Sequence, residues 1–153
     1  MDKVLVTLLL IIAGVVCSVV VINATYPAIT GSSGAIADAA GKINDRIKSQ
    51  VKVIEITHES DTVYIWVKNV GASRIGGIEN SDIFFGPEGN FARITYGGST
   101  APYWDYTIEN DTNWGPTATL KITIHLQSAP SGSCYFKIVI PNGISDGKLY
   151  SAS

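Results

Sequence analysis

The sequence is poor in charge and in reactive side chains. Only 16% of its 153 residues are charged, and it holds two cysteines, two histidines and one methionine. The first 50 residues carry four basic and three acidic side chains, and the rest carry seven basic and ten acidic ones. Neither part has the basic excess that binding to a phosphate backbone requires, so we expect no nucleic-acid partner. The length allows one modest globular domain with one separate element attached.

Catalytic and cofactor motifs are also missing. There is no GxSxG, no phosphate-binding loop and no dinucleotide fingerprint. His58 and His125 fall on different predicted elements, and Cys17 and Cys134 form no CxxC pair, so both cysteines are more typical of buried small apolar residues. We therefore predict a protein that is not an enzyme and that binds no cofactor.

Two groups of polar residues are candidate metal sites. His58, Glu59 and Asp61 could converge on an ion, but consecutive polar residues between two strands are more typical of a solvated hairpin. Asp82 and Glu88, around "GPEGN", lack the fuller carboxylate set of a calcium loop. We predict no metal centre and leave a weak cation site near Asp82 and Glu88 as the alternative.

One long hydrophobic run dominates the N-terminus. Residues 4–22 contain 19 positions without a charge. As a helix, such a run is close to the roughly 30 Å of a bilayer core, and it exceeds the usual core of a cleaved secretory signal. We predict a membrane-competent helix here.

A second helical stretch is predicted beyond Pro27, which should kink or interrupt the helix. Within residues 34–50, the spacing of Ile36, Ala40, Ile43 and Ile47 places one apolar stripe on the helix. Small residues around the stripe would let neighbouring helices approach closely. The stripe must pack against the C-terminal domain or against other copies of the chain.

From Val51 onward the pattern alternates with a period of two, as in β-strands. In "VYIWVK", for example, Val63, Ile65 and Val67 share one face. The predicted strands are VKVIEIT, VYIWVK, SDIFFG, FARITYG, YWDYTI, TLKITIHL, SCYFKIVI and a last short one at GKLYSA. We predict an α+β chain with a hydrophobic helical domain over residues 1–50 and an immunoglobulin-like antiparallel β-sandwich over residues 51–153.

Aromatic side chains admit two interpretations. Trp66, Trp104 and Trp114, with Tyr103 and Tyr106, could line a carbohydrate-stacking surface, or they could pack within or between subunits. We favour packing, because the apolar stripe already indicates self-association.

Asn23 and Asn110 each begin an Asn-x-Thr sequon and are candidate N-glycosylation sites. Asn110 lies in a polar loop, whereas Asn23 lies at the edge of the apolar run. Use of either site would place the sandwich outside the cell.

The hydrophobic helix continues as "INATYPAITGSSGAIADAAGKINDRIKSQVKVIEI" and leads into a β-domain whose early strand ends "IWVKNVGASRI". This arrangement resembles the archaellin family, the subunits of the archaeal swimming filament and their relatives in the same machinery. The resemblance implies that N-terminal helices bundle into a filament core and that immunoglobulin-like domains form the outer sheath. It implies a homo-oligomeric helical filament, a membrane-inserted subunit before assembly, and motor and surface-layer proteins as partners. The predicted polymerisation helix comprises Leu5, Leu8, Leu9, Ile12, Val16, Val19, Ile36, Ile43 and Ile47.

One feature departs from that family. Archaellin precursors carry a short basic leader that a prepilin-type peptidase removes, whereas this chain begins at Met1 with only Lys3 as a basic residue. An unprocessed chain looks more like the membrane-anchored accessory proteins of the same motor, which share the sandwich and act outside the membrane as a stator that binds the surface layer. We expect an extracellular filament subunit for motility, with the stator protein or a pilin-like adhesin as alternatives.

Overall fold

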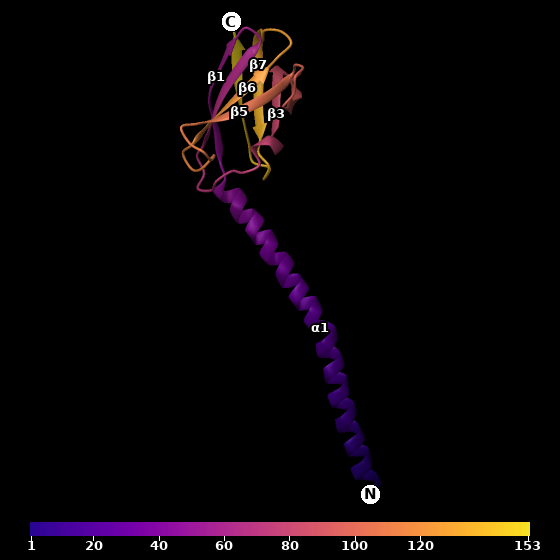
Figure 1. The fold of residues 1–153 in the computed structure, drawn as a ribbon. Helices are drawn as coiled ribbons and strands as arrows, with labels where there is room; N and C mark the ends of the chain where they lie inside the picture. The colour runs from indigo at the N-terminus through magenta and orange to yellow at the C-terminus, as the bar shows by residue number, and fades with distance from the viewer. The chain divides into compact units, whose positions relative to one another are not determined.

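The computed structural model describes all 153 residues and contains one long helix and eight β-strands (Figure 1). By its internal contacts the chain separates into two compact units, Met1–Lys42 and Ile43–Ser153, so the last turns of the helix belong with the sandwich. The elements are α1 (Asp2–Lys48), β1 (Val51–Glu59), β2 (Thr62–Asn69), β3 (Asp82–Pro87), β4 (Ala92–Tyr96), β5 (Tyr103–Glu109), β6 (Thr119–His125), β7 (Gly132–Val139) and β8 (Ser145–Ala152), with one 3-10 turn at Ile78–Asn80.

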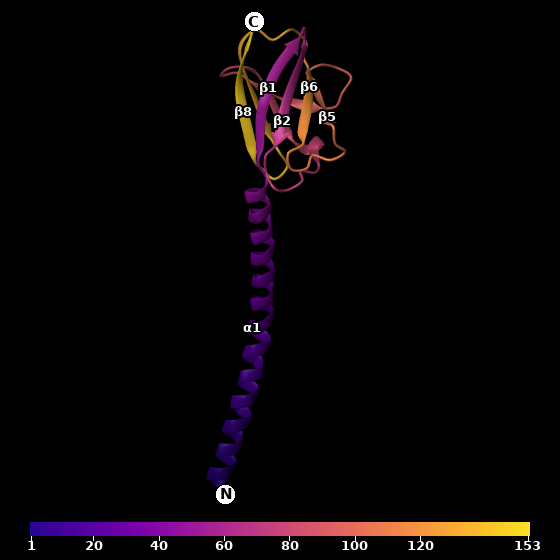
Figure 2. The ribbon, with the colours of Figure 1, turned by 90° about the vertical axis from the view of Figure 1, so that its left-hand side faces the viewer.

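Helix α1 continues through Pro27, so the predicted interruption is wrong and one helix replaces the two predicted stretches. Figure 1 and Figure 2 show the helix bending near its middle, in line with the predicted kink. Proline removes one backbone donor from the helix ladder. Hydroxyl groups on both sides add hydrogen bonds to nearby carbonyls. Thr25 Oγ1 donates to Val21 O (2.6 Å), and Thr30 Oγ1 donates to Tyr26 O (3.1 Å). Neither hydroxyl bonds to Asn23 O, the carbonyl that lacks its backbone donor because of Pro27, so these bonds do not replace the missing one.

All eight predicted strands form, each within two residues of its predicted bounds. Their order is β1-β2-β6-β5-β4-β3-β7-β8, and every neighbouring pair is antiparallel except β4 and β5. Strands β4 and β5 belong to different halves of the sandwich. The loop of residues 97–102 carries the chain from one half to the other, and β5 then runs in the same direction as β4. The prediction of a mostly antiparallel sandwich is confirmed, with this one correction.

The core lies between the two halves of the sandwich, where the alternating apolar faces meet. Ile65 pairs in register with Ile122, and Val63 with Ile124, so adjacent strands present matching rows of branched side chains. Leu126, which follows the end of β6, is half-buried and packs against the edge of this core. The largest fully buried side chains are Trp104, Trp114, Phe136, Ile65, Ile83, Leu120, Ile122, Ile124, Ile138, Ile140, Val63 and Val67.

Side chains, rather than a backbone ladder, join the two end strands, β1 and β8. Figure 2 shows β8 running beside β1, and the two strands are in contact. The Val53 N–H donates to Asp146 Oδ2 (2.8 Å), and Lys148 Nζ donates to Ile54 O (2.7 Å). The register of β1 shifts at Ile54, as in a β-bulge. Charged side chains thus occupy backbone groups that an open sheet edge would offer to another strand.

Candidate interaction surfaces and the helix-to-sandwich junction

The apolar surface of α1 has no partner within the chain. No residue of α1 is buried, and the helix is long and apolar enough to cross a membrane by length and composition. The nine residues of the predicted polymerisation helix all lie on α1. Their role in polymerisation stays a prediction.

The C-terminal end of α1 is capped by the loop that follows β2. We define residues 69–73 as the junction loop. The Ala72 N–H donates to Lys48 O (2.7 Å), and the N–H groups of Val70 and Gly71 donate to Gln50 O (2.9 and 3.1 Å). The last carbonyls of a helix have no partner within it and need donors of this kind. The junction loop therefore caps the helix through the Ala72 N–H and also binds the segment that follows the helix at Gln50.

Asn69 holds the junction loop in shape. Its side chain is fully buried, and its Nδ2 donates to Ser73 O (2.9 Å) and to Trp114 O (3.1 Å). Its Oδ1 accepts from the Gly71 N–H (3.0 Å). One amide therefore ties three loop groups together, a geometry that no apolar side chain could supply.

Gly71 permits the close approach of the loop to the helix end. A Cβ added there would lie 2.4 Å from Lys48 O and 2.5 Å from Gln50 N. Both neighbours are backbone atoms that cannot rotate away. Only glycine fits this position without a shift of the helix end or the loop.

The tryptophans do not form one surface. Trp104 and Trp114 are buried in the core of the sandwich, each 1% exposed, so the interpretation of an aromatic carbohydrate-stacking surface is wrong for these two. Trp66 is half-buried on the outer face of β2, and Lys121 Nζ lies 5.5 Å from its ring centroid and 4.6 Å from that of Tyr64.

The two histidines make separate contacts and share no site. His125 Nε2 lies 3.1 Å from Asp105 Oδ2, and its ring stacks on Tyr103 with centroids 4.5 Å apart. His58 lies at the far end of β1, and its Nδ1 bonds to the Tyr150 hydroxyl of β8. These contacts lie on the sheet surface rather than around a cavity.

The proposed weak cation site near Asp82 and Glu88 is not formed. Asp82 opens β3 and pairs with Arg93 (2.6 Å), whereas Glu88 follows the end of β3 and accepts from Ser133 Oγ (2.8 Å). The length of the strand separates the two carboxylates. No group of three His, Cys, Asp or Glu side chains in the structure could hold a metal ion.

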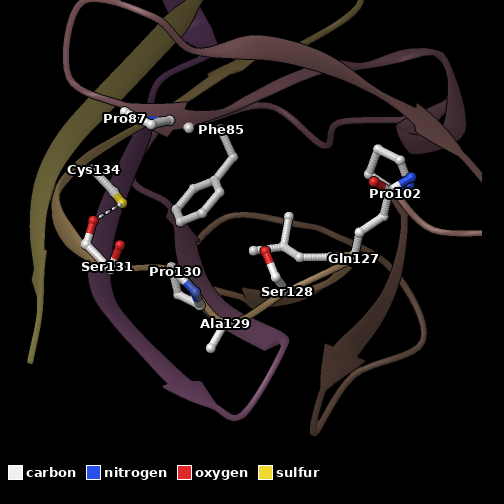
Figure 3. A pocket seen from close by; sticks show the side chains of 11 residues that line it. Phe85, Pro87, Pro102, Gln127, Ser128, Ala129, Pro130, Ser131 and Cys134 are labelled. Carbon is white, nitrogen blue, oxygen red and sulfur yellow. Dashed lines mark hydrogen bonds between the residues drawn. The ribbon is translucent and has the colours of Figure 1, made fainter.

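One apolar pocket of about 340 Å³ lies between the end of β3 and the connection from β6 to β7 (Figure 3). The ring of Phe85 points into it, with Pro87, Pro102 and Pro130 around it. Cys134 borders the pocket, and its Sγ lies 3.8 Å from Ser131 O. Burial raises the pKa of the Cys134 thiol, so it is a poor nucleophile.

The two sequons lie on different elements. Asn23 is on α1, and Asn110 is exposed in the loop after β5 with a φ of 56°. An exposed loop suits a glycan better than a membrane-edge helix does, and glycosylation of either residue stays a prediction.

The chain matches a known protein family over nearly its whole length. The model of the archaeal-type flagellin family matches residues 3–147. An uncharacterized protein of Archaeoglobus fulgidus is 28% identical over 161 residues, covering 97% of this chain and 98% of the relative.

Solved structures with a similar fold come from Sulfolobus acidocaldarius. The archaellum periplasmic stator protein FlaG is 30% identical with a TM-score of 0.61, covering 67% of this chain and 99% of the solved chain. A chain of the archaellum periplasmic stator protein complex of FlaF and FlaG is 30% identical with a TM-score of 0.60, covering 66% of this chain and 88% of the solved chain. The family and these neighbours are structural archaellum components rather than enzymes.

Proposed function

The chain belongs to the archaeal-type flagellin family, and we propose that it is a membrane-anchored component of the archaellum of the stator type. The observation that carries the proposal is its likeness to FlaG, which extends over nearly all of that solved chain. This ranks the stator above the filament subunit that the sequence favoured. Being archaellum-related, the chain is a structural protein of the motility machinery.

In this proposal, residues 4–22 of α1 lie in the bilayer and the sandwich lies outside the cell. The run is uncharged and has the length of a bilayer core. A stator must carry load between the membrane and a fixed partner. The junction loop serves that purpose, because its hydrogen bonds to Lys48 O and Gln50 O fasten the last turn of the helix to the sandwich.

The partners follow from the same likeness. FlaG is found in a complex with FlaF, so we propose a second sandwich protein of that kind as the partner of this one. The surface layer is the proposed fixed support. The sandwich offers an exposed sheet surface for such contacts, and its end strands are closed by charged side chains that disfavour edge-to-edge association.

A filament subunit is the second candidate, because the matching family model is that of archaeal-type flagellins and because α1 is one uninterrupted helix. In that case the apolar surface of α1 leaves lipid for neighbouring helices on assembly.

Cell fractionation separates the two candidates. Filaments are sheared from archaellated cells, and the chain is quantified by mass spectrometry in the sheared filaments and in the membranes. A stator component stays in the membrane fraction at low copy number and retains its initiating Met. A filament subunit dominates the sheared fraction and has an N-terminus produced by a peptidase. That second result would refute the stator proposal.

A substitution in the anchor supplies a control. Leu9→Asp places a charge in the apolar run, whereas Asp38→Asn removes one in the polar part of α1. For a stator protein, Leu9→Asp releases the chain from the membrane while filaments still form. Loss of filaments with Leu9→Asp, but not with Asp38→Asn, favours the filament subunit.

A further inference from the structure

We propose that residues 22–47 of α1, the stalk, pair with the stalk of a second copy of this chain as a parallel, in-register two-stranded coiled coil. The proposal uses one part of the proposed function, the membrane anchor, which gives the two helices a common direction. It differs from the predicted filament core, in which several neighbours surround the whole helix, because here one face of residues 22–47 takes one partner helix.

A seven-residue repeat carries the proposal. Isoleucine recurs every seventh residue, and each isoleucine is followed four positions later by a second residue of the same face. We call these eight positions the stalk seam: Ile22, Ile29, Ile36 and Ile43 with Tyr26, Ser33, Ala40 and Ile47. Alternating intervals of four and three are the signature of a left-handed coiled coil, and a helix that packs on a globular surface has no need of so strict a period. All four of the repeating isoleucines are exposed.

Charge is placed on the other side of the stalk. With the isoleucines at position d of the heptad, Asp38 and Asp45 fall at f, Lys42 at c and Lys48 at b, all facing away from the seam. Arg46 falls at g and flanks the seam. An identical helix can therefore approach the seam without like charges meeting within it.

The backbone irregularities also lie away from the seam. Pro27, Gly34 and Gly41 fall at position b. The donor that proline lacks and the flexible glycines thus face outward. Small residues at the flanking e and g positions, such as Ala37 and Ala39, leave room for a second helix to come close.

The serine hydroxyl within the seam is already satisfied by its own helix, and the Tyr26 ring carries the only other hydroxyl of the seam. Ser33 Oγ donates to Ile29 O of its own helix (2.9 Å). The flanking Thr30 Oγ1 and Ser32 Oγ likewise donate to Tyr26 O (3.1 Å) and Ala28 O (2.8 Å). Burial against a partner therefore leaves none of these three donors without an acceptor.

A second copy fits this seam because the repeat is self-complementary. In a parallel, in-register pair each layer meets its own kind, Ile36 against Ile36 and Ser33 against Ser33. Residues 4–22 of both copies lie in the same bilayer, which sets the same direction and the same height for the two stalks. The anchor thereby selects the register in which the isoleucine layers coincide.

Disulfide cross-linking of the full chain in proteoliposomes tests the pairing. In a Cys17→Ser background, Ile36→Cys places a thiol in the seam and Asp38→Cys places one on the outer face. Paired d positions bring the Cα atoms within reach of a disulfide, so we expect roughly tenfold more cross-linked dimer for Ile36→Cys on mild oxidation. Equal yields at the two positions would overturn the proposal.

Two matched variants test the same pairing without cysteine. Ile36→Asp and Ala35→Asp add the same charge at adjacent positions of α1, but only the first lies in the seam. Photobleaching of single labelled complexes in vesicles should show pairs for wild type and Ala35→Asp and single chains for Ile36→Asp. Pairs that persist in Ile36→Asp, or cross-links in native membranes that join this chain only to a different protein, refute self-pairing. Neither result bears on the fractionation that tests the stator proposal.

Discussion

Replacing Gly71 by Ala tests the structure of the helix cap most directly. The added Cβ would lie 2.4 Å from Lys48 O and 2.5 Å from Gln50 N. Both distances are shorter than the contacts that a Cβ makes with non-bonded atoms in folded proteins. Because both neighbours are backbone atoms, the loop and the end of α1 must move apart. The hydrogen bonds nearest to that displacement are Gly71 N to Gln50 O (3.1 Å) and Ala72 N to Lys48 O (2.7 Å).

The expected loss has two parts. Overpacking by one carbon in a tightly packed region costs about 1–3 kcal/mol. Weakening one or two hydrogen bonds adds about 1 kcal/mol. Reduced freedom of the unfolded chain returns about 0.4–1 kcal/mol when Gly becomes Ala. The free energy of unfolding of the sandwich unit should therefore fall by about 2–3 kcal/mol, and its Tm by on the order of 10 °C.

Gly76→Ala is the matched control. It lies five positions along the chain from Gly71, and a Cβ added there meets nothing within 4 Å. It should be neutral or slightly stabilising, since only the unfolded chain changes. Thermal unfolding of both full-length variants in detergent can be followed by the fluorescence of the buried tryptophans. Two variants with the same Tm would refute the assignment of Gly71 to a close backbone approach.

Three further predictions concern single side chains. Asn69→Ala should lower the free energy of unfolding by about 3 kcal/mol in chemical denaturation, since it removes three hydrogen bonds of a buried amide and leaves a cavity in its place; a change below about 1 kcal/mol would contradict this role. Burial, and to a smaller extent the negative charge of Glu79, raise the pKa of Tyr106 above 10.0. The contribution of Tyr106 to stability is therefore present below pH 10 and is lost as the pH rises through the folded-state pKa. Glu79→Gln should lower this pKa in an ultraviolet titration. Cys134, in a Cys17→Ser background, should react with Ellman's reagent only on unfolding, and a fast reaction of the folded chain would contradict its burial.

The strands were predictable mainly because β2, β3, β6 and β7 alternate between buried and less buried residues along most of their length. Val63, Ile65 and Val67 point into the core, as their spacing predicted, and the turns between strands are marked by Gly, Asn and Pro. Periodicity reports which face is buried, and in a sandwich that information nearly fixes each strand. The uncharged run likewise predicted a helix, because so long an apolar segment has few other stable forms.

Features that depend on distant contacts were not predictable in this way. Pro27 predicted a kink or an interruption, and the sequence alone could not say which, because a helix can continue past one missing donor when the rest of its hydrogen bonds are kept. Trp104 and Trp114 could not be placed as core residues from spacing alone, since an aromatic side chain suits a core and a surface equally well. The side-chain hydrogen bonds between β1 and β8 were not predictable either. In the sequence, Asp146 and Lys148 do not differ from charged residues that face solvent.

The residues of the family resemblance hold the junction between the helix and the sandwich. They would do so in a filament subunit and in a stator protein alike. Asn69 and Gly71 of "VKNVG" are required wherever the end of a long helix must be fastened to a sandwich, because one supplies three hydrogen bonds and the other the space for close approach. A filament subunit and a stator protein both transmit force through that joint, so the motif identifies the design without separating the two uses. What separates them is the surface that each helix presents beyond the joint. A filament core needs apolar contact on several sides of each helix, whereas the stalk seam of this chain is a single face with Asp38, Lys42 and Asp45 on the opposite side. That one-sided pattern suits one partner helix along the stalk, whereas residues 4–22 are uncharged on every side, so the stalk is the part of the helix in which an anchored pair and a polymer would differ.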